Sequence, residues 1–181
     1  MKLSIDFENI DYLKVGNERQ TSAYNNLTQY KILDHLKLYS PIVTGTIPIG
    51  IDIPESDIDI ICECNDHNKF ASVVIHHFSK MQGFHIYRSK QNDKEVTIAE
   101  FKTEKFLIEL FAQNTPTKQQ NAYLHMNIEY AILKEKGNSF QQEVIKLKAS
   151  GLKTEPAFAK LLGLKGGPYE ELLKLQTKYT N

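Results

Sequence analysis

Two aspartates, Asp57 and Asp59, open an isoleucine-rich strand within the stretch IPIGIDIPESDIDII at residues 47–61, and this pattern constrains the fold most. Side chains alternate between the two faces of a strand, so both aspartates point to one face while the isoleucines beside them point to the other. The isoleucine face is expected to pack on a hydrophobic core. The pattern therefore predicts a half-buried strand over 57–63 with two carboxylates side by side, next to the loop that follows Gly45.

A later segment, KFLIELFAQ at residues 105–113, offers a third acid. Alternation directs Phe106, Ile108 and Leu110 toward the core and leaves Glu109 on the opposite face. Two unit charges 4 Å apart repel by roughly 4 kcal/mol at an effective dielectric constant of 20, so three neighbouring carboxylates require protons or cations. Carboxylate oxygens suit Mg²⁺ or Mn²⁺ bound together with phosphate. The three acids therefore predict a divalent metal site for a phosphate substrate.

Glu100, on the preceding strand, is an alternative third acid. Its alternation groups it with Val96 and Ile98, so Glu109 is the preferred residue. Two aspartates one residue apart are common in chains of this size, and their position after the Gly45-Thr46 turn is what favours a site here.

Apolar periodicity along the chain predicts a mixed α/β (α+β) fold. The expected strands cover 41–46, 57–63, 84–89, 95–103 and 105–111, the last two joined as a hairpin. The expected helices cover 6–15, 18–38, a segment capped by Asn65 or Asp66 and ending before Gly83, a long helix after Thr117, 139–150 and two shorter C-terminal helices. We expect helices mainly on one face of the sheet and a helical region that walls one side of a cleft.

Length and composition predict a single domain over residues 1–181, with a core at about 18–112 and a C-terminal helical region at about 117–181. The 22 basic and 22 acidic residues give no net charge, so no long nucleic acid and no anionic membrane is expected as a partner. No stretch approaches the roughly 20 apolar residues of a membrane span, and acids stand where a signal peptide carries an apolar core. A cytoplasmic protein is expected.

Four further side chains carry weaker expectations. Cys62 and Cys64 point to one face of a strand without further zinc ligands at a recognisable spacing, so they are expected to be reduced, buried apolar side chains. His77 lies on the apolar stripe of its helix and is expected in the core. His125 on the long helix either lines the cleft or faces water.

The Gly45-Thr46 pair, the aspartates at 57 and 59 and the later acid Glu109 resemble the signature of the nucleotidyltransferase superfamily related to polymerase beta. Four segments, GNERQ, GTIPIGIDIPESDIDI, QNAYLHMNIEY and GLKTEPAFAKLLGL, together resemble more closely the bacterial domain-of-unknown-function family numbered 4269. This resemblance spans nearly the whole chain. It implies a nucleotidyltransferase fold that binds an NTP and two Mg²⁺ (or Mn²⁺) ions.

The resemblance implies a role for each matching position. Gly45 lets backbone amides approach the triphosphate, and Thr46 offers a hydroxyl in place of the superfamily's usual serine, with an added methyl group. Asp57 and Asp59 bind both metal ions. Glu109 binds the metal nearer the attacking hydroxyl, at a position where superfamily members often carry aspartate.

Arg19 and Lys153 are further candidates for contact with the nucleotide, each with a structural alternative. Arg19 has a planar guanidinium that suits phosphate, and it equally suits a salt bridge at a helix start. Lys153 precedes a helix for which Thr154 is the expected cap, so it either reaches the triphosphate or the acceptor, or belongs to the helix start alone.

The expected function is metal-dependent transfer of a nucleoside monophosphate from an NTP to the hydroxyl of a small molecule, a protein side chain or an RNA end. Two alternatives remain open. One is a catalytically inactive nucleotide-binding module of the same fold. The other is an interaction domain in which the acids only cap a turn.

Overall fold

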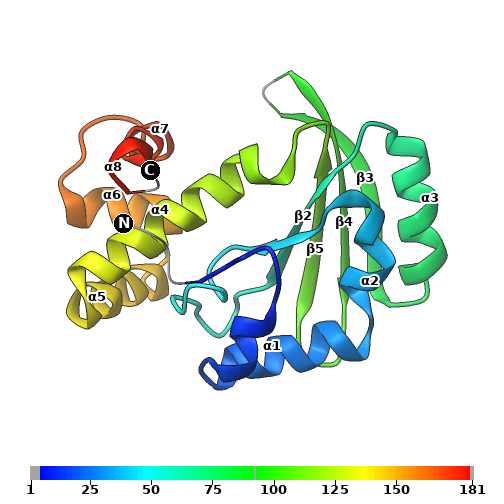
Figure 1. The fold of residues 1–181 in the computed structure, drawn as a ribbon, viewed down its shortest axis with the longest axis horizontal. Coiled ribbons are helices and arrows are strands. Elements are labelled where there is room, and N and C mark those ends of the chain that lie inside the picture. The colour runs from blue at the N-terminus through cyan, green and yellow to red at the C-terminus, as the bar shows by residue number, and fades with distance from the viewer. Residues whose placement is uncertain (1–4, 92, 180–181) are drawn as a thin grey trace.

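A five-stranded mixed sheet forms one half of the protein, as Figure 1 shows for the computed structural model, which describes residues 5–91 and 93–179. Its strands are β1 (Ile42–Thr44), β2 (Ile58–Glu63), β3 (Gln82–Gln91), β4 (Lys94–Lys102) and β5 (Leu107–Gln113). They lie in the order β1-β2-β5-β4-β3, and β2 and β5 are parallel while all other neighbours are antiparallel. The predicted mixed sheet is confirmed, including the hairpin of β4 and β5.

One face of this sheet is covered by the helices that precede and follow β1 and β2 (Figure 1). These helices are α1 (Glu18–Gln29), α2 (Ile32–Leu36), the 3₁₀ turn η2 (Lys37–Tyr39) and α3 (His67–Phe78). The hydrophobic cluster beneath them includes Leu27 and Phe70 from the helices and Ile60 and Ile108 from the strands. The alternation predicted for the two strands therefore places their apolar side chains in this core.

The buried cysteines and the start of α3 agree with the sequence reading. Cys62 and Cys64 are free and buried, and burial raises the pKa of both thiols. Asp66 caps α3, because its side chain accepts hydrogen bonds from the backbone N–H groups of Asn68 and Lys69.

A second hydrophobic cluster lies among the C-terminal helices, which stand on the other side of the sheet in Figure 1. They are η3 (Thr117–Gln119), α4 (Asn121–Lys136), α5 (Asn138–Ala149), α6 (Thr154–Leu162), α7 (Pro168–Leu173) and α8 (Gln176–Tyr179). The long helix α4 runs from the sheet into this group, and Ile128, Ile132 and Phe158 are completely buried. The Gln120 side chain donates to the carbonyls of Cys62 and Thr115 and so ties the start of α4 to the end of β2.

The expected helix over 6–15 is wrong for its first half, because only the 3₁₀ turn η1 (Asp11–Val15) forms. The Asp6 side chain accepts from the backbone N–H of Glu8 and the Asn9 side chain from that of Asp11. Such local side-chain bonds compete with a helix for the same backbone groups.

The single helix expected over 18–38 is also wrong, because the chain breaks between α1 and α2. Lys31 adopts a left-handed conformation with φ of 51°. Leu27 and Ile32 are both buried, yet residues five apart lie on different faces of one helix. Breaking the helix at Lys31 buries both.

Three smaller expectations about helices also need correction. His77 is exposed on α3, where its ring stacks on that of His35 with centroids 3.8 Å apart. Lys153, not Thr154, occupies the N-cap of α6, and no side-chain cap bond forms there. Three short helices follow α5 in the described residues, not two, since α6, α7 and α8 are separate.

Among the helices of residues 5–91 and 93–179, none combines the length and apolar character needed to cross a membrane.

Replacing Lys31 with glycine tests this break in the helix. We expect Lys31→Gly to raise the free energy of unfolding by about 0.5–1 kcal/mol, because glycine adopts a positive φ without the steric penalty of a side chain. In a continuous helix the same change would lower stability by about that amount. Urea denaturation measures the difference. The matched change Gln29→Gly, at the end of α1, is expected to lower stability.

Candidate active site cleft

A cleft of about 840 Å³ lies where the sheet faces the C-terminal helices. Residues from the strands and loops of the sheet half line one wall, and residues from α4, α5 and α6 line the other. Six of the seven residues proposed for the site from the sequence line this cleft: Gly45, Thr46, Asp57, Asp59, Glu109 and Lys153. The structure thus brings together residues that are up to 108 positions apart in the chain, counted from Gly45 to Lys153.

The acids belong to a row of residues that crosses the sheet. Thr44 on β1 pairs with Asp59 on β2, and Asp59 pairs with Glu109 on the parallel neighbour β5. Glu109 in turn lies opposite Glu100 on β4. Adjacent strands are about 4.8 Å apart, and paired residues point to the same face. Asp59 and Glu109 are therefore direct neighbours on the cleft side of the sheet.

The prediction that Glu100 and Glu109 point to different faces of the sheet is wrong. Glu100 is the direct cross-strand partner of Glu109, and both point to the same side. Glu109 lines the cleft, whereas Glu100 is not among the lining residues. Glu100 therefore adds negative charge behind Glu109 without reaching the cleft.

Burial and neighbouring negative charges raise the pKa of Asp59 and of Glu109. Burial raises the pKa of Asp59 to about 7, and the charges of Asp57 and Glu109 add to the rise. Burial, Asp57 and Glu100 likewise raise the pKa of Glu109. Within the part of the chain that the structure describes, none of the ion pairs involves Asp57, Asp59 or Glu109.

The turn after β1 approaches Asp59 at Gly45, which adopts φ of 81°. A Cβ atom at this position would collide with the Asp59 carboxylate in its present position, so glycine permits this close approach. The next residue, Thr46, places its hydroxyl 3.3 Å from that of Ser56, which also accepts from the backbone N–H of Ile53 at 3.0 Å. Ser56 lines the cleft, although the sequence analysis did not predict it as a site residue and indicated only a loop there.

Arg19 is the proposed residue that the structure does not bring to the cleft lining. Its guanidinium donates to the carbonyls of Pro54 and Ser56 at 3.1 and 2.8 Å, stacks 4.5 Å from the Phe106 ring centroid and lies 3.9 Å from the Asp52 carboxylate. These contacts hold the loop that ends at the aspartates. Within the described residues, the contacts of Arg19 are with other residues of the chain, which agrees with the alternative of a structural role.

Three further side chains fix the same loop through its carbonyl groups. Gln20 of α1 donates to Ile47 and Pro48 at 3.0 and 3.1 Å. From the helical half, Gln141 donates to Gly50 and Lys148 to Ile51, each at 2.8 Å. The loop between β1 and β2 is therefore held from both sides, in addition to the hydrogen bonds within the loop itself.

The helical wall supplies a second set of ionisable groups, namely His125, Glu129, Lys148, Lys153 and Glu155. His125 lines the cleft and is only 5% exposed, which decides between its two sequence-based alternatives. Burial lowers its pKa, although Glu155 and Glu170 act in the opposite direction. Burial raises the pKa of Glu129 well above its ordinary value, and Glu155 adds to this.

Glu129 and Lys148 were not predicted as site residues from the sequence. The available signal for Glu129 was its position one turn after His125, within the run 128–133 that is otherwise apolar. Lys148 follows the buried Val144 by one turn and so projects inward from α5. Burial lowers its pKa, while Glu129, Asp52, Asp59 and Glu155 favour its charged form.

This fold is that of the polymerase-beta-like nucleotidyltransferases. The structure of the GLD-2/RNP-8 complex matches with a TM-score of 0.56 and 15% identity, over 94% of this chain and 66% of that one. The polymerase core of TRAMP, an RNA surveillance complex, matches with 0.52 and 12%, over 92% and 55%. A mutant of the Cid1 poly(U) polymerase bound to MgATP matches with 0.53 and 11%, over 87% and 49%. The chain thus spans about half to two thirds of these proteins' lengths.

The chain belongs to the family described as Domain of unknown function (DUF4269), whose sequence profile matches residues 25–175. No curated protein sequence matches it significantly.

Adding a methyl group at Gly45 tests the close approach to Asp59. We expect Gly45→Ala to lower the free energy of unfolding by more than the roughly 1–2 kcal/mol that a left-handed alanine costs, because the new Cβ also displaces the Asp59 carboxylate. Gly163→Ala is the matched control, since Gly163 has φ of 67° but no neighbour within 4 Å of the added Cβ. Equal losses in the two variants, measured by thermal unfolding, would contradict the close approach.

The raised pKa of Asp59 predicts a stability that falls as pH rises in metal-free protein. Between about pH 4 and 7 the folded carboxyl keeps a proton that the unfolded one, with an ordinary pKa of 3.8, releases. At about 1.4 kcal/mol per pKa unit the rise to about 7 corresponds to a loss on the order of 4 kcal/mol, complete above pH 7. Asp59→Asn is expected to flatten this fall and to stabilise the protein at pH 8.

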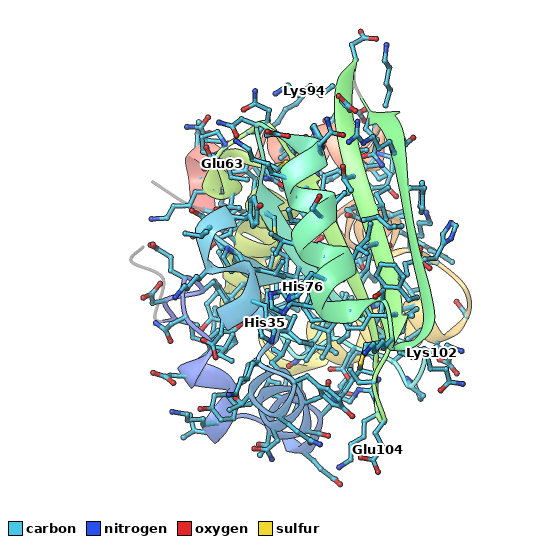
Figure 2. All side chains as sticks on the ribbon, turned by 90° about the vertical axis from the view of Figure 1, so that its right-hand side faces the viewer. His35, Glu63, His76, Lys94, Lys102 and Glu104 are labelled. Atoms are coloured by element: carbon cyan, nitrogen blue, oxygen red, sulfur yellow. The ribbon has the colours of Figure 1, made fainter. Side chains whose placement is uncertain are left out.

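Thermal unfolding from pH 4 to 8 measures this effect. Glu104→Gln, at the far end of the β4–β5 hairpin in Figure 2, is the control, because its exposed side chain lies away from the cleft. A pH profile that Asp59→Asn leaves as steep as before would count against the assignment to Asp59.

Proposed function

We propose that this protein is a divalent-metal-dependent nucleotidyltransferase that moves a nucleoside monophosphate from an NTP to an acceptor hydroxyl, with pyrophosphate as the leaving group. The observation that carries the proposal is the gathering of Asp57, Asp59 and Glu109 on one wall of the cleft, beside Gly45, without a partner cation in the described residues. The shared fold supports the reaction class by analogy.

The residues fit Mg²⁺ or Mn²⁺ on the chemistry of their donors. All three side chains offer hard carboxylate oxygens, and the raised pKa values of Asp59 and Glu109 mean that the cation-free arrangement is electrostatically unfavourable. Asp57, Asp59 and Glu109 would hold the ions. When bound, two such ions polarise the transferred phosphoryl group and lower the pKa of the attacking hydroxyl.

The chain itself would bind and orient the substrate. Gly45 adopts a positive φ beside Asp59, and the backbone amides of this turn would donate to a phosphate. The hydroxyls of Thr46 and Ser56, which lie together at the cleft, would donate to a phosphate oxygen. Lys153 lines the opposite wall with an exposed ammonium group that would pair with the triphosphate or the acceptor.

The similar structures support an NTP as the donor. Structures of the Cid1 poly(U) polymerase contain MgATP and MgGTP, and another refers to the RNA terminal uridylyl transferase activity of that protein. For this chain the acceptor would be a small molecule, a protein side chain or an RNA end. Its balanced charge favours a short acceptor over a long nucleic acid, because phosphate binding along a strand requires clustered Lys and Arg.

A second candidate function is a nucleotide-binding module that does not transfer the nucleotide. Thr46 stands where the superfamily usually has serine, and its hydroxyl is already engaged with Ser56 at 3.3 Å. A threonine held in this way would bind a phosphate oxygen less freely than a serine. This module would bind an NTP with Mg²⁺ and leave it intact.

Thermal unfolding with each of the four NTPs and Mg²⁺ tests the binding that both candidates share. A ligand at about 100 times its Kd adds roughly 2.7 kcal/mol, which corresponds to about 5–10 °C in a chain of this size. Asp59→Asn is expected to abolish this shift. Glu63→Gln, on the same strand but outside the cleft, is the matched control and is expected to keep it. An unchanged shift in Asp59→Asn would sink the proposal.

Transfer itself is measured with α-labelled NTPs, Mg²⁺ and a cell extract as the source of acceptors. Label on any acceptor that is lost in Glu109→Gln supports the transferase. A thermal shift without label supports the binding module.

A further inference from the structure

Three ionisable side chains meet on the helical wall of the cleft, apart from the acids of the sheet. His125 and Glu129 lie one turn apart on α4 and therefore share a face of that helix. Glu155, in the first turn of α6, faces them. Each residue offers a ligand atom, and these atoms all lie within 4.8 Å of one another. All three side chains line the cleft.

The two α4 residues are deeply buried, and each has a polar atom that lacks a hydrogen-bond partner in the described residues. His125 is 5% and Glu129 is 4% exposed. Both His125 Nδ1 and Glu129 Oε1 are buried without a hydrogen-bond partner among the described residues. Buried polar atoms of this kind are costly and rare unless a ligand, an ion or a water completes them. The cluster therefore contains groups that point to a missing partner.

Lys148 is a nearby cation, yet it does not fill this role. Its ammonium group donates to the Ile51 carbonyl at 2.8 Å and so holds the loop of the sheet half. Among the residues that the structure describes, no ion pair joins a Lys or Arg nitrogen to Glu129 or Glu155. Lys148 contributes at most a longer-range attraction to Glu129.

We propose that His125, Glu129 and Glu155 bind one divalent transition-metal ion of the Zn²⁺ type. One imidazole and two carboxylates form a mixed nitrogen and oxygen donor set, and the imidazole favours Zn²⁺ over Mg²⁺. A small inward movement of the side chains would bring all three ligand atoms within coordination distance. Three protein ligands leave a position for a water or an anionic oxygen, and this position faces the cleft, because the ligands line it.

This site is separate from the one proposed for the nucleotide. Its ligands come from α4 and α6, whereas Asp57, Asp59 and Glu109 come from β2, β5 and the loop before β2. The inference therefore stands whether or not the protein transfers nucleotides. Zn²⁺ binding and the response to NTP with Mg²⁺ can each fail alone.

Calorimetric titration of Zn²⁺ into metal-free full-length protein, in excess Mg²⁺ to occupy the sheet acids, tests the site. We expect one Zn²⁺ per chain. Loss of an outer-shell partner alone weakens metal binding by about 10- to 100-fold, so Glu129→Gln and Glu155→Gln are each expected to cost at least about tenfold in affinity. Co²⁺ serves as a spectroscopic probe, and its visible absorption is expected to change when the wild type, but neither variant, is titrated.

Two controls separate this site from other metal-binding groups. His77→Ala breaks up the group of imidazoles on α2 and α3, of which Figure 2 labels His35 and His76, and is expected to leave the Zn²⁺ site intact. Glu109→Gln removes an acid of the sheet and is likewise expected to retain Zn²⁺ binding while losing the response to NTP with Mg²⁺.

The same variants also test whether Glu129 and Glu155 have only a structural role in the fold. Glu129→Gln removes a buried carboxylate, so we expect metal-free protein to be at least as stable as the wild type while the stabilisation by Zn²⁺ is lost. Glu155 is only partly buried, and its variant provides the test if Glu129→Gln does not fold. Wild-type Zn²⁺ affinity in both glutamine variants, or loss of binding in His77→Ala or Glu109→Gln alone, would overturn the proposal.

Discussion

The parallel pairing of β2 with β5 places Asp59 beside Glu109, and the electrostatics of the cleft follow from this register. A shift of one residue in either strand would turn its acid toward the hydrophobic core, where Ile60 and Leu110 now lie. The core face therefore fixes the register, and the register fixes the spacing of the carboxylates. Repulsion between them is built into the folded state, because the same apolar packing that positions them also removes them from water.

The loop between β1 and β2 completes this arrangement through contacts from outside the sheet. Gly45 can approach Asp59 because it has no side chain, and Arg19 and Gln20 hold the rest of the loop through its carbonyl groups. Gln141 and Lys148 reach the same loop from α5. The N-terminal helix and the helical half thus both determine where the turn stands relative to the acids.

The cleft has two walls of different chemistry. The sheet wall carries three carboxylates suited to hard cations, and the helical wall carries an imidazole, two carboxylates and the ammonium groups of Lys148 and Lys153. With the proposed metal ions bound to the sheet acids, a substrate with phosphate groups would meet cations on both walls. A chain without net charge can thus place ammonium groups in a cleft close to a group of acids.

The alternation of isoleucine and aspartate in β2, and of leucine and glutamate in β5, established in advance which side chains face the core, because the period of a strand is a local property. The break at Lys31 could not be predicted in this way, since it depends on burying both Leu27 and Ile32 in the hydrophobic cluster beneath the helices. The bracing role of Arg19, the cross-strand position of Glu100 and the meeting of His125, Glu129 and Glu155 depend on which elements pack together. For β2 and β5, the sequence by itself determined the strands, their buried faces and the acids on their opposite faces. Only the tertiary structure decided which of these acids share a cleft and what stands across from them, because strand order and helix packing arise from contacts between residues far apart in the chain.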